Sequence, residues 1–144
     1  MMPVNTYNPA LISVITGAKI ISGYSDDSQV TVERMTDSFA ESVGADGHVT
    51  RSRTNDNRGT ITVQLMQSSP SNDDLQAYAT NDELNGTGTF PVLVRDASGR
   101  TICSGDQAWL VKTATAEYGR SITNRTWTIR VANLVMNVGG NNTL

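Results

Sequence analysis

The sequence predicts a mainly β domain, an antiparallel β-sandwich or barrel with one flanking α-helix. Three observations lead to this fold class. Several short segments alternate apolar and polar residues, as half-buried strands do. Only 17% of the residues are charged, while Thr, Ser, Asn and Gly are abundant, a composition typical of strands and turns. A single stretch combines helical spacing with a helix start signal.

The chain length of 144 residues predicts one domain over 1–144. The end segments, 1–9 and 139–144, are polar or rich in glycine, and we expect them to be flexible. Between them the sequence contains no linker and no internal repeat.

The first third of the chain contains four short predicted strands. Residues 10–15 and 18–23 are apolar runs separated by a Thr-Gly pair, which predicts a tight turn. Residues 29–33 alternate cleanly and predict the third strand. Residues 38–43 form the fourth, and the glycines of 44–47 end it.

The strongest alternation in the chain lies at 60–65. The side chains expected to face the core are Ile61, Val63 and Leu65, and those expected to face away from it are Thr60, Thr62 and Gln64. The preceding segment, 44–59, includes the run HVTRSRTNDNRG and has no sustained period. We therefore predict a long polar loop over 44–59, either the tip of a long hairpin or an extended connection between two strands.

One helix is predicted over residues 71–85. Ser71 follows a proline and is expected to be the N-cap, with Asp74 three residues later in a position resembling a capping box. Asn85 and Gly86 end the helix. The apolar stripe expected to lie on the sheet consists of Leu75, Tyr78, Ala79 and Leu84.

The remaining segments predict strands again. Residues 90–95 and 100–105 form a predicted hairpin around a turn rich in Asp, Ser and Gly. Residues 107–112 form the next strand, and its Trp109 is expected to face the core together with Val111.

A final alternating strand is predicted at 125–131, where the side chains expected to face inward are Trp127, Ile129 and Val131. The alternation changes phase near Asn133, which predicts a β-bulge. After it, Leu134, Met136 and Val138 continue the pattern.

The residue inventory argues against catalysis and against a bound cofactor or metal. His48 is the one histidine and lies in the polar segment, without a nearby cysteine or second histidine to complete a site. Cys103 is the one cysteine and lies in an alternating run. We therefore expect no enzyme, no cofactor and no metal site. No stretch approaches the roughly 20 apolar residues of a membrane span.

Binding of nucleic acid is also disfavoured. The formal net charge is −3, whereas nucleic-acid binders are usually strongly basic. Arg51, Arg53 and Arg58 give the polar segment a local positive charge, but no aromatic residue is interleaved for base stacking. The abundant polar strand faces and the polar segment favour a protein that assembles with other copies of itself.

An alternative function is a carbohydrate- or host-binding β-sandwich module of a phage or secreted particle. Such a module would need clustered exposed aromatic side chains for stacking on sugars. Aromatic residues are scarce, and both tryptophans, Trp109 and Trp127, are assigned to the core faces of strands.

Several short motifs, in their order and spacing over roughly 11–140, resemble one family. They are GYSD at 23–26, VER at 32–34, VGADG at 43–47, TRS at 50–52, SSPSND at 68–73, FPV at 90–92 with Asp96, Ala108–Trp109, EYGR at 117–120, and the run from Trp127 to Gly140. This sequence is similar to the tail tube proteins of contractile-tailed bacteriophages, which are related in fold to secretion-system tube proteins.

The resemblance implies a structural virion protein of the tail, assembled in the host cytoplasm. Six subunits are expected to form a ring, and the rings to stack into a hollow inner tube that conducts DNA during ejection. The implied partners are other copies of the chain, the tail sheath, the baseplate and the tape-measure protein. Double-stranded DNA is expected to pass without specific binding.

The resemblance also implies roles for particular residues. The 44–59 segment would reach a neighbouring subunit or the next ring, and its contact candidates are His48, Thr50, Arg51, Arg53, Asn55, Asp56 and Arg58. The acidic counterparts on another copy would be chosen from Asp26, Asp27, Glu33, Asp37 and Glu41. The candidates for the lumen face are Thr60, Thr62, Gln64, Thr128 and Arg130, on the polar faces of strong strands.

Overall fold

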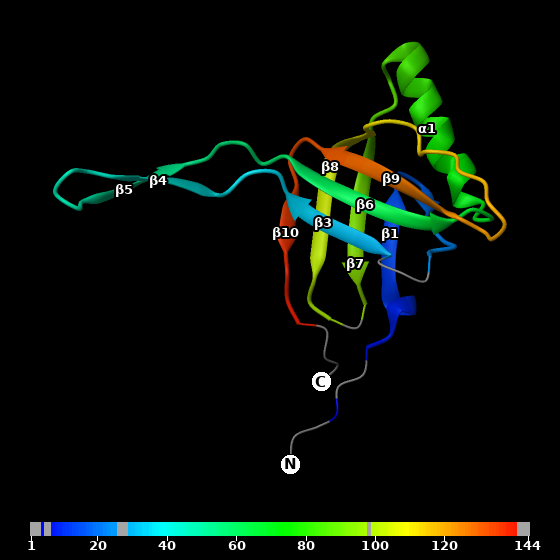
Figure 1. Ribbon diagram of the computed structural model, residues 1–144, viewed down its shortest axis with the longest axis horizontal. Coiled ribbons are helices and arrows are strands. Elements are labelled where there is room, and N and C mark those ends of the chain that lie inside the picture. The colour runs from blue at the N-terminus through cyan, green and yellow to red at the C-terminus, as the bar shows by residue number, and fades with distance from the viewer. Residues whose placement is uncertain (1–3, 5–6, 26–28, 98, 141–144) are drawn as a thin grey trace.

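The computed structural model describes residues 4, 7–25, 29–97 and 99–140, and it is mainly antiparallel β with one α-helix (Figure 1), which confirms the predicted fold class. In chain order the elements are η1 Pro9–Leu11, β1 Ile12–Thr16, β2 Lys19–Ile20, β3 Val30–Arg34, β4 Phe39–Val43, β5 Val49–Arg53, β6 Gly59–Met66, α1 Ser71–Asn85, β7 Phe90–Asp96, β8 Ile102–Leu110, β9 Asn124–Val131 and β10 Val135–Asn137. The predicted flexible ends and Asp26 and Asp27 lie largely or wholly outside the described residues.

The main sheet runs in the order β2-β1-β7-β8-β9-β6-β3, and β10 pairs with β8. All of these pairings are antiparallel. Figure 1 shows the sheet folded over itself, so that β3, β6 and β9 form one layer across β1, β7, β8 and β10. The two layers enclose the core.

Strand β8 joins the two layers, and it corrects the prediction of separate strands at 100–105 and 107–112. It pairs with β10 near Cys103 and with β9 near Trp109, and it pairs with β7 over most of its length. Between Phe90 and Val92 the register shifts: these residues are two positions apart on β7, and their partners on β8, Ala108 and Gly105, are three positions apart. This bulge lets a single strand bend from one layer to the other without ending.

The β-bulge that the sequence predicted near Asn133 is not present. Strand β9 ends at Val131, and the chain crosses to pair β10 with β8. Leu134 is fully buried at this crossing. A Cβ added to Gly59 would clash with the Leu134 side chain, so Leu134 fills the space that glycine leaves. The change of phase in the sequence therefore marks a crossing of the chain.

The predicted alternation describes the core of the β6–β9 pair correctly. Ile61, Val63 and Leu65 are fully buried on β6, and Ile129 and Val131 on β9. Trp127 is also buried, and its indole N–H donates to Asn72 Oδ1 at 2.9 Å. That hydrogen bond satisfies the polar atom of a buried aromatic side chain and ties the sheet to the start of α1.

Trp109 was expected in the core, and this assignment is wrong. On β8 the buried neighbours are Ala108 and Leu110, while Trp109 is half-buried on the opposite face. Val111 is 46% exposed. In the run AWLV both alternate sets are apolar, so the sequence does not fix which set faces inward.

The helix α1 spans the predicted residues, but its start and its stripe differ from the prediction. Pro70 holds the N-cap position without a side-chain hydrogen bond, and the Ser71 hydroxyl accepts from the Ser22 N–H at 2.9 Å. Leu84 is 77% exposed because the C-terminal part of the helix extends beyond the sheet (Figure 1). Gly86 ends the helix with φ 67°, as predicted.

Candidate assembly surfaces

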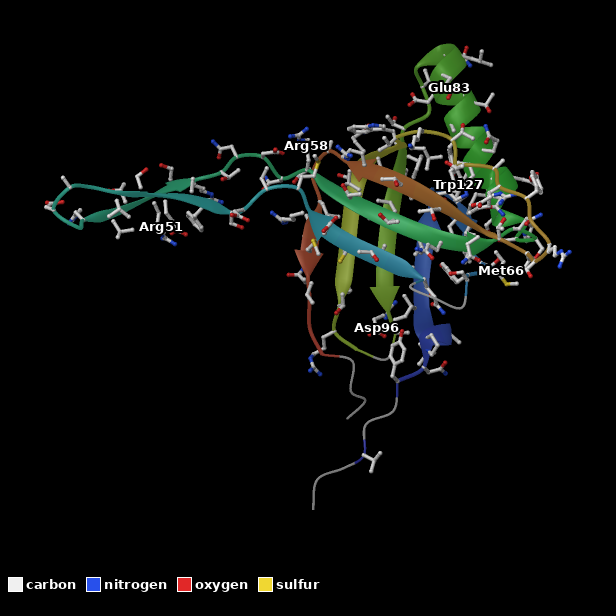
Figure 2. The ribbon with its side chains drawn as sticks, in the orientation of Figure 1. Arg51, Arg58, Met66, Glu83, Asp96 and Trp127 are labelled. Carbon is white, nitrogen blue, oxygen red and sulfur yellow. The ribbon has the colours of Figure 1, made fainter. Side chains whose placement is uncertain are left out.

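A two-stranded hairpin, β4–β5, projects from the layered body of the chain (Figure 1). Its register runs from Phe39 opposite Arg53 to Val43 opposite Val49. The turn between the strands is closed by the Gly44 N–H, which donates to the His48 carbonyl at 2.8 Å, and Gly47 has φ 87°. Every residue of both strands is exposed, and Figure 2 shows Arg51 on this hairpin, away from the layered body.

The hairpin refines the prediction of a polar loop over 44–59. The segment 49–53 is a strand, β5, that pairs with β4 at 39–43, where the sequence predicted a strand over 38–43. The open connection is therefore confined to 54–58. Both faces of this strand meet water, so its sequence carries no apolar alternation to reveal it.

The two faces of the hairpin differ in side-chain size. One face, here called the large face, consists of Phe39, Glu41, Val43, Val49, Arg51 and Arg53. The other carries small residues only, Ala40, Ser42, Thr50 and Ser52. The Arg51 guanidinium lies 4.1 Å above the centre of the Phe39 ring, a cation–π contact within the large face. At the tip, Val43 is 69% exposed and Val49 58% exposed.

Arg58 has a partner in its own chain. Its guanidinium donates to both carboxylate oxygens of Asp56, at 2.9 and 2.8 Å, and its backbone N–H donates to Asp56 Oδ1 at 3.1 Å. The side-chain hydrogen bonds from Arg58 lower the pKa of Asp56 from 3.8 to about 2. The pair therefore shapes the base of the hairpin within the subunit.

Further hydrogen bonds fix the base of the hairpin. The Thr54 N–H donates to the Ser38 carbonyl at 2.9 Å and extends the pairing of the two strands, and the Met35 N–H donates to the Arg58 carbonyl at 3.2 Å. Arg34 at the end of β3 donates to the Leu134 carbonyl at 2.9 Å and to Asn57 Oδ1 at 3.3 Å. The direction in which the hairpin leaves the body is thus set by side chains of β3 and the β9–β10 crossing.

The other predicted contact residues are scattered along this segment. His48 lies in the turn, Thr50 on the small face, and Asn55 is exposed beyond β5. Among the predicted acids, Glu41 lies opposite Arg51 in the same hairpin. Glu33 lies on β3 opposite Thr60, and Asp37 is exposed between β3 and β4.

The five lumen candidates do share one polar face of the β3–β6–β9 layer. Thr60 lies opposite Arg130, and Thr62 opposite Thr128, while Gln64 follows on the same side of β6. All five are half-buried. Sequence reasoning missed the neighbours that extend this face, which are Thr31, Glu33, Thr126 and Trp109.

One row across this face combines opposite charges and an aromatic ring. In register, Glu33 is followed by Thr60, then Arg130, then Trp109. The Arg130 Nε is buried and has no hydrogen-bond partner within the described part of the chain. The face is therefore polar, with both signs of charge present.

The described residues lack the side-chain clusters and the helices that would indicate a metal site or a membrane span. They contain no group of three or more His, Cys, Asp or Glu side chains placed to hold a metal ion. They also include no helix with the length and apolar character needed to cross a bilayer.

Comparison with known sequences gives two matches over most of the chain. Residues 9–139 match the family described as "Bacteriophage PhiTE tail tube protein". "Structural protein ORF10" of Pseudomonas phage KPP10 is 32% identical over 145 residues, covering 95% of this chain and 84% of that protein.

Solved structures with a similar fold come from contractile injection systems. The anti-feeding prophage cap, described as the AFP tube terminating cap, matches with a TM-score of 0.65 at 10% identity, covering 95% of this chain and 94% of the cap. The PVC sheath-tube complex in its extended state gives 0.63 at 15% identity, covering 92% and 91%. The PVC sheath/tube terminator gives 0.62 at 14% identity, covering 96% and 99%. At such identities the likeness concerns the fold.

Proposed function

The chain belongs to the bacteriophage PhiTE tail tube protein family, and on this premise we propose that six copies close into a ring and that the rings stack into a hollow tube. As a member of a tail tube family it is a structural protein and a component of the virion. In the proposed tube, DNA passes through the lumen during ejection. Assembly takes place in the host cytoplasm.

The observation that carries this proposal is the bare β4–β5 hairpin. A two-stranded hairpin on its own is marginally stable in water. This one extends two valines and a phenylalanine into solvent, with Val43 69% exposed. Packing of the large face against another copy accounts for these apolar side chains, because burial of apolar area is the main driving force of association. Arg51 and Arg53 then set the register of the contact through charge complementarity.

The polar face of the β3–β6–β9 layer is proposed to line the lumen. Its threonine hydroxyls and the Gln64 amide offer weak, neutral contacts to a passing duplex. Arg130 is balanced in its row by Glu33, two strands away. A strongly basic wall would hold DNA through phosphate contacts, so this mixed face suits passage without binding.

Contacts with the sheath, the baseplate and the tape-measure protein belong to the proposal as well. The tape-measure protein would occupy the lumen before DNA does. The sheath would contact the outer surface of the tube, away from the β3–β6–β9 face. The PVC complex named above, whose description joins sheath and tube, supports the sheath as a partner by likeness of fold.

Electron microscopy of the concentrated purified protein tests the proposal directly. We expect hollow tubes or rings, with six-fold symmetry in averaged end-on views. A protein that stays monomeric at all concentrations and binds a glycan would overturn it in favour of the carbohydrate-binding alternative. Rings with another symmetry would overturn the hexamer.

A further inference from the structure

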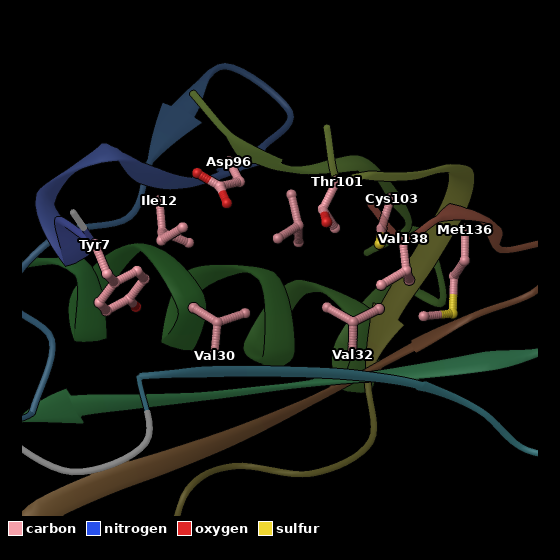
Figure 3. Close-up of a pocket in the computed structure, with 10 residues that line it drawn as sticks. Tyr7, Ile12, Val30, Val32, Asp96, Thr101, Cys103, Met136 and Val138 are labelled. Atoms are coloured by element: carbon pink, nitrogen blue, oxygen red, sulfur yellow. The ribbon is translucent and has the colours of Figure 1, made fainter. Parts of the chain in front are cut away.

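An open cleft lies between the two layers of the sheet, with β3 on one side and β1, β7, β8 and β10 on the other (Figure 3). Its volume is about 280 Å³. The residues that line it are Tyr7, Ile12, Val30, Val32, Val94, Asp96, Thr101, Cys103, Met136 and Val138. At its mouth, Val138 is 73% exposed and Tyr7 59% exposed. The chain therefore carries an apolar recess that its own described residues leave open.

We propose that this cleft receives the hairpin tip, Val43 and Val49, of a second copy of the chain. The proposal rests on the function proposed above and names the receiving surface for the hairpin.

The tip has the shape and chemistry of an insert. Val43 and Val49 are directly opposite each other at the last registered pair of the hairpin. Paired residues of an antiparallel ladder point to the same face, so the two side chains form one apolar projection. The Gly44–His48 turn beyond them is closed by its own hydrogen bonds and does not need to unfold for insertion.

The cleft has the matching chemistry. Figure 3 shows Val30 and Val32 on the β3 side, facing Ile12, Cys103 and Val138 across the gap. A small-molecule site of about 300 Å³ or more normally adds several converging polar groups to such walls. The polar side-chain atoms lining this cleft, apart from the tyrosine and the thiol, belong to Asp96 and Thr101. An aliphatic protein insert therefore fits better than a polar ligand.

The same two surfaces cannot meet within one chain. Figure 1 shows that the hairpin leads away from the layers that form the cleft, and the hydrogen bonds of Arg34 to Asn57 and Leu134 hold its base in place. A projection and a recess on different parts of one subunit make a heterologous contact. Such a contact leaves one free projection and one free recess after each addition, so it continues into a ring or a filament. This is the type of interface that a stacked tube requires.

Chemical cross-linking tests the pairing in the assembled protein. In a Cys103→Ala background, V49C at the tip is combined with V138C at the cleft mouth, and a short bis-maleimide joins thiols that lie close together. The matched control combines V49C with A77C on an exposed position of α1. We expect a ladder of covalent dimers and higher oligomers from V49C with V138C, and none from the control.

The outcomes separate this proposal from the function on which it rests. If V49C with V138C forms tubes but no covalent oligomers, the cleft is not the receiving surface, and the tube function is unaffected. An equal amount of covalent oligomers from the V49C and A77C control would also overturn the cleft assignment. If the unsubstituted protein forms neither rings nor tubes, the proposed function fails and the cleft assignment fails with it.

Discussion

The β4–β5 hairpin and the β6–β9 pair are both antiparallel ladders that contain valine, threonine and arginine, but their surroundings differ. On β6 every second residue is buried, from Gly59 to Leu65. On β4 and β5 every residue is exposed. Backbone pairing alone therefore does not distinguish them. The β6–β9 pair is therefore stabilised by burial within its own chain. The β4–β5 hairpin has no such burial and, in the proposed tube, is stabilised by another copy.

The largest effect should come from the buried ladder. Ile129→Ala removes a fully buried side chain from the centre of β9. Loss of apolar burial together with the cavity left behind should lower the free energy of unfolding by about 2–5 kcal/mol. Urea denaturation of the unassembled subunit measures it. A loss below about 1 kcal/mol would mean that the β6–β9 pair is not the stable part of the molecule.

The tip should behave in the opposite way. Val43→Ser with Val49→Ser should leave urea denaturation of the subunit within about 0.5 kcal/mol, because both side chains are exposed. Assembly should weaken strongly, since burying one valine at an interface contributes about 1.5–3 kcal/mol. The critical concentration for tube formation, measured by sedimentation, should rise by at least about tenfold.

The control for the tip is the small face of the same hairpin. Ser42→Ala with Thr50→Ala changes two exposed residues that point away from Val43 and Val49. We expect its critical concentration to stay near that of the unsubstituted protein. If the control weakens assembly as much as the valine variant, the large face is not the contact surface.

The arginines should have a smaller effect, and they should not act as one group. Arg51→Ala, Arg53→Ala and Arg58→Ala together should leave the circular dichroism nearly unchanged and suppress polymerisation. Arg58 is paired with Asp56 in its own chain, so the double variant at 51 and 53 should account for most of the loss. Exposed ion pairs contribute only about 0.2–1 kcal/mol each, which keeps this effect below that of the valine variant. Unfolding of the triple variant as a monomer would show that this segment belongs to the core. Normal tubes would show that the arginines are not needed.

The smallest effect concerns Asp56 and pH. Its pKa in the folded chain is about 2, against an ordinary value of 3.8, and the hydrogen bonds from Arg58 are the main cause. A lowered pKa stabilises the fold above about pH 4, and this contribution is lost as the pH falls through about 2. Carboxyl titration by NMR should give a midpoint near 2 for Asp56, and Arg58→Ala should move it towards 3.8. An unchanged midpoint would contradict the pairing.

The contrast between the two ladders also explains what could be read from the sequence. The alternation of β6 and β9 is strong because each has one face in the core and one outside it, so Ile61 and Ile129 were placed correctly. Gly86 marked the end of the helix because its φ of 67° disfavours other residues. Strand β5 gave no such signal, because neither of its faces meets the core.

Other errors arose where two patterns compete. Trp109 and Leu110 are both apolar, and only the bulge near Gly105 decides which of them faces inward. Leu84 fits the helical spacing, but it is exposed because the sheet does not extend far enough to cover this part of the helix. These features depend on where the layers end and bend, which is a tertiary property.

The proposed contact surface lies in or next to the segment that the sequence indicated, but its exposed valines were not among the predicted contact residues. The positive charges predicted Arg51, Arg53 and Arg58 as contact residues, and Arg58 is paired with Asp56 of its own chain. Val43 and Val49 flank the turn as single apolar residues, and nothing local shows that they point the same way. Only the register of the hairpin brings them together.

Amide hydrogen exchange followed by mass spectrometry tests most directly whether another copy stabilises the hairpin. Peptides covering 39–53 and 59–66 should be compared in the unassembled subunit and in tubes. We predict that the 59–66 amides exchange slowly in both, and that the 39–53 amides exchange fast in the subunit and slowly in tubes. Equally fast exchange of 39–53 in both states would contradict the account, because the hairpin would then remain bare after assembly.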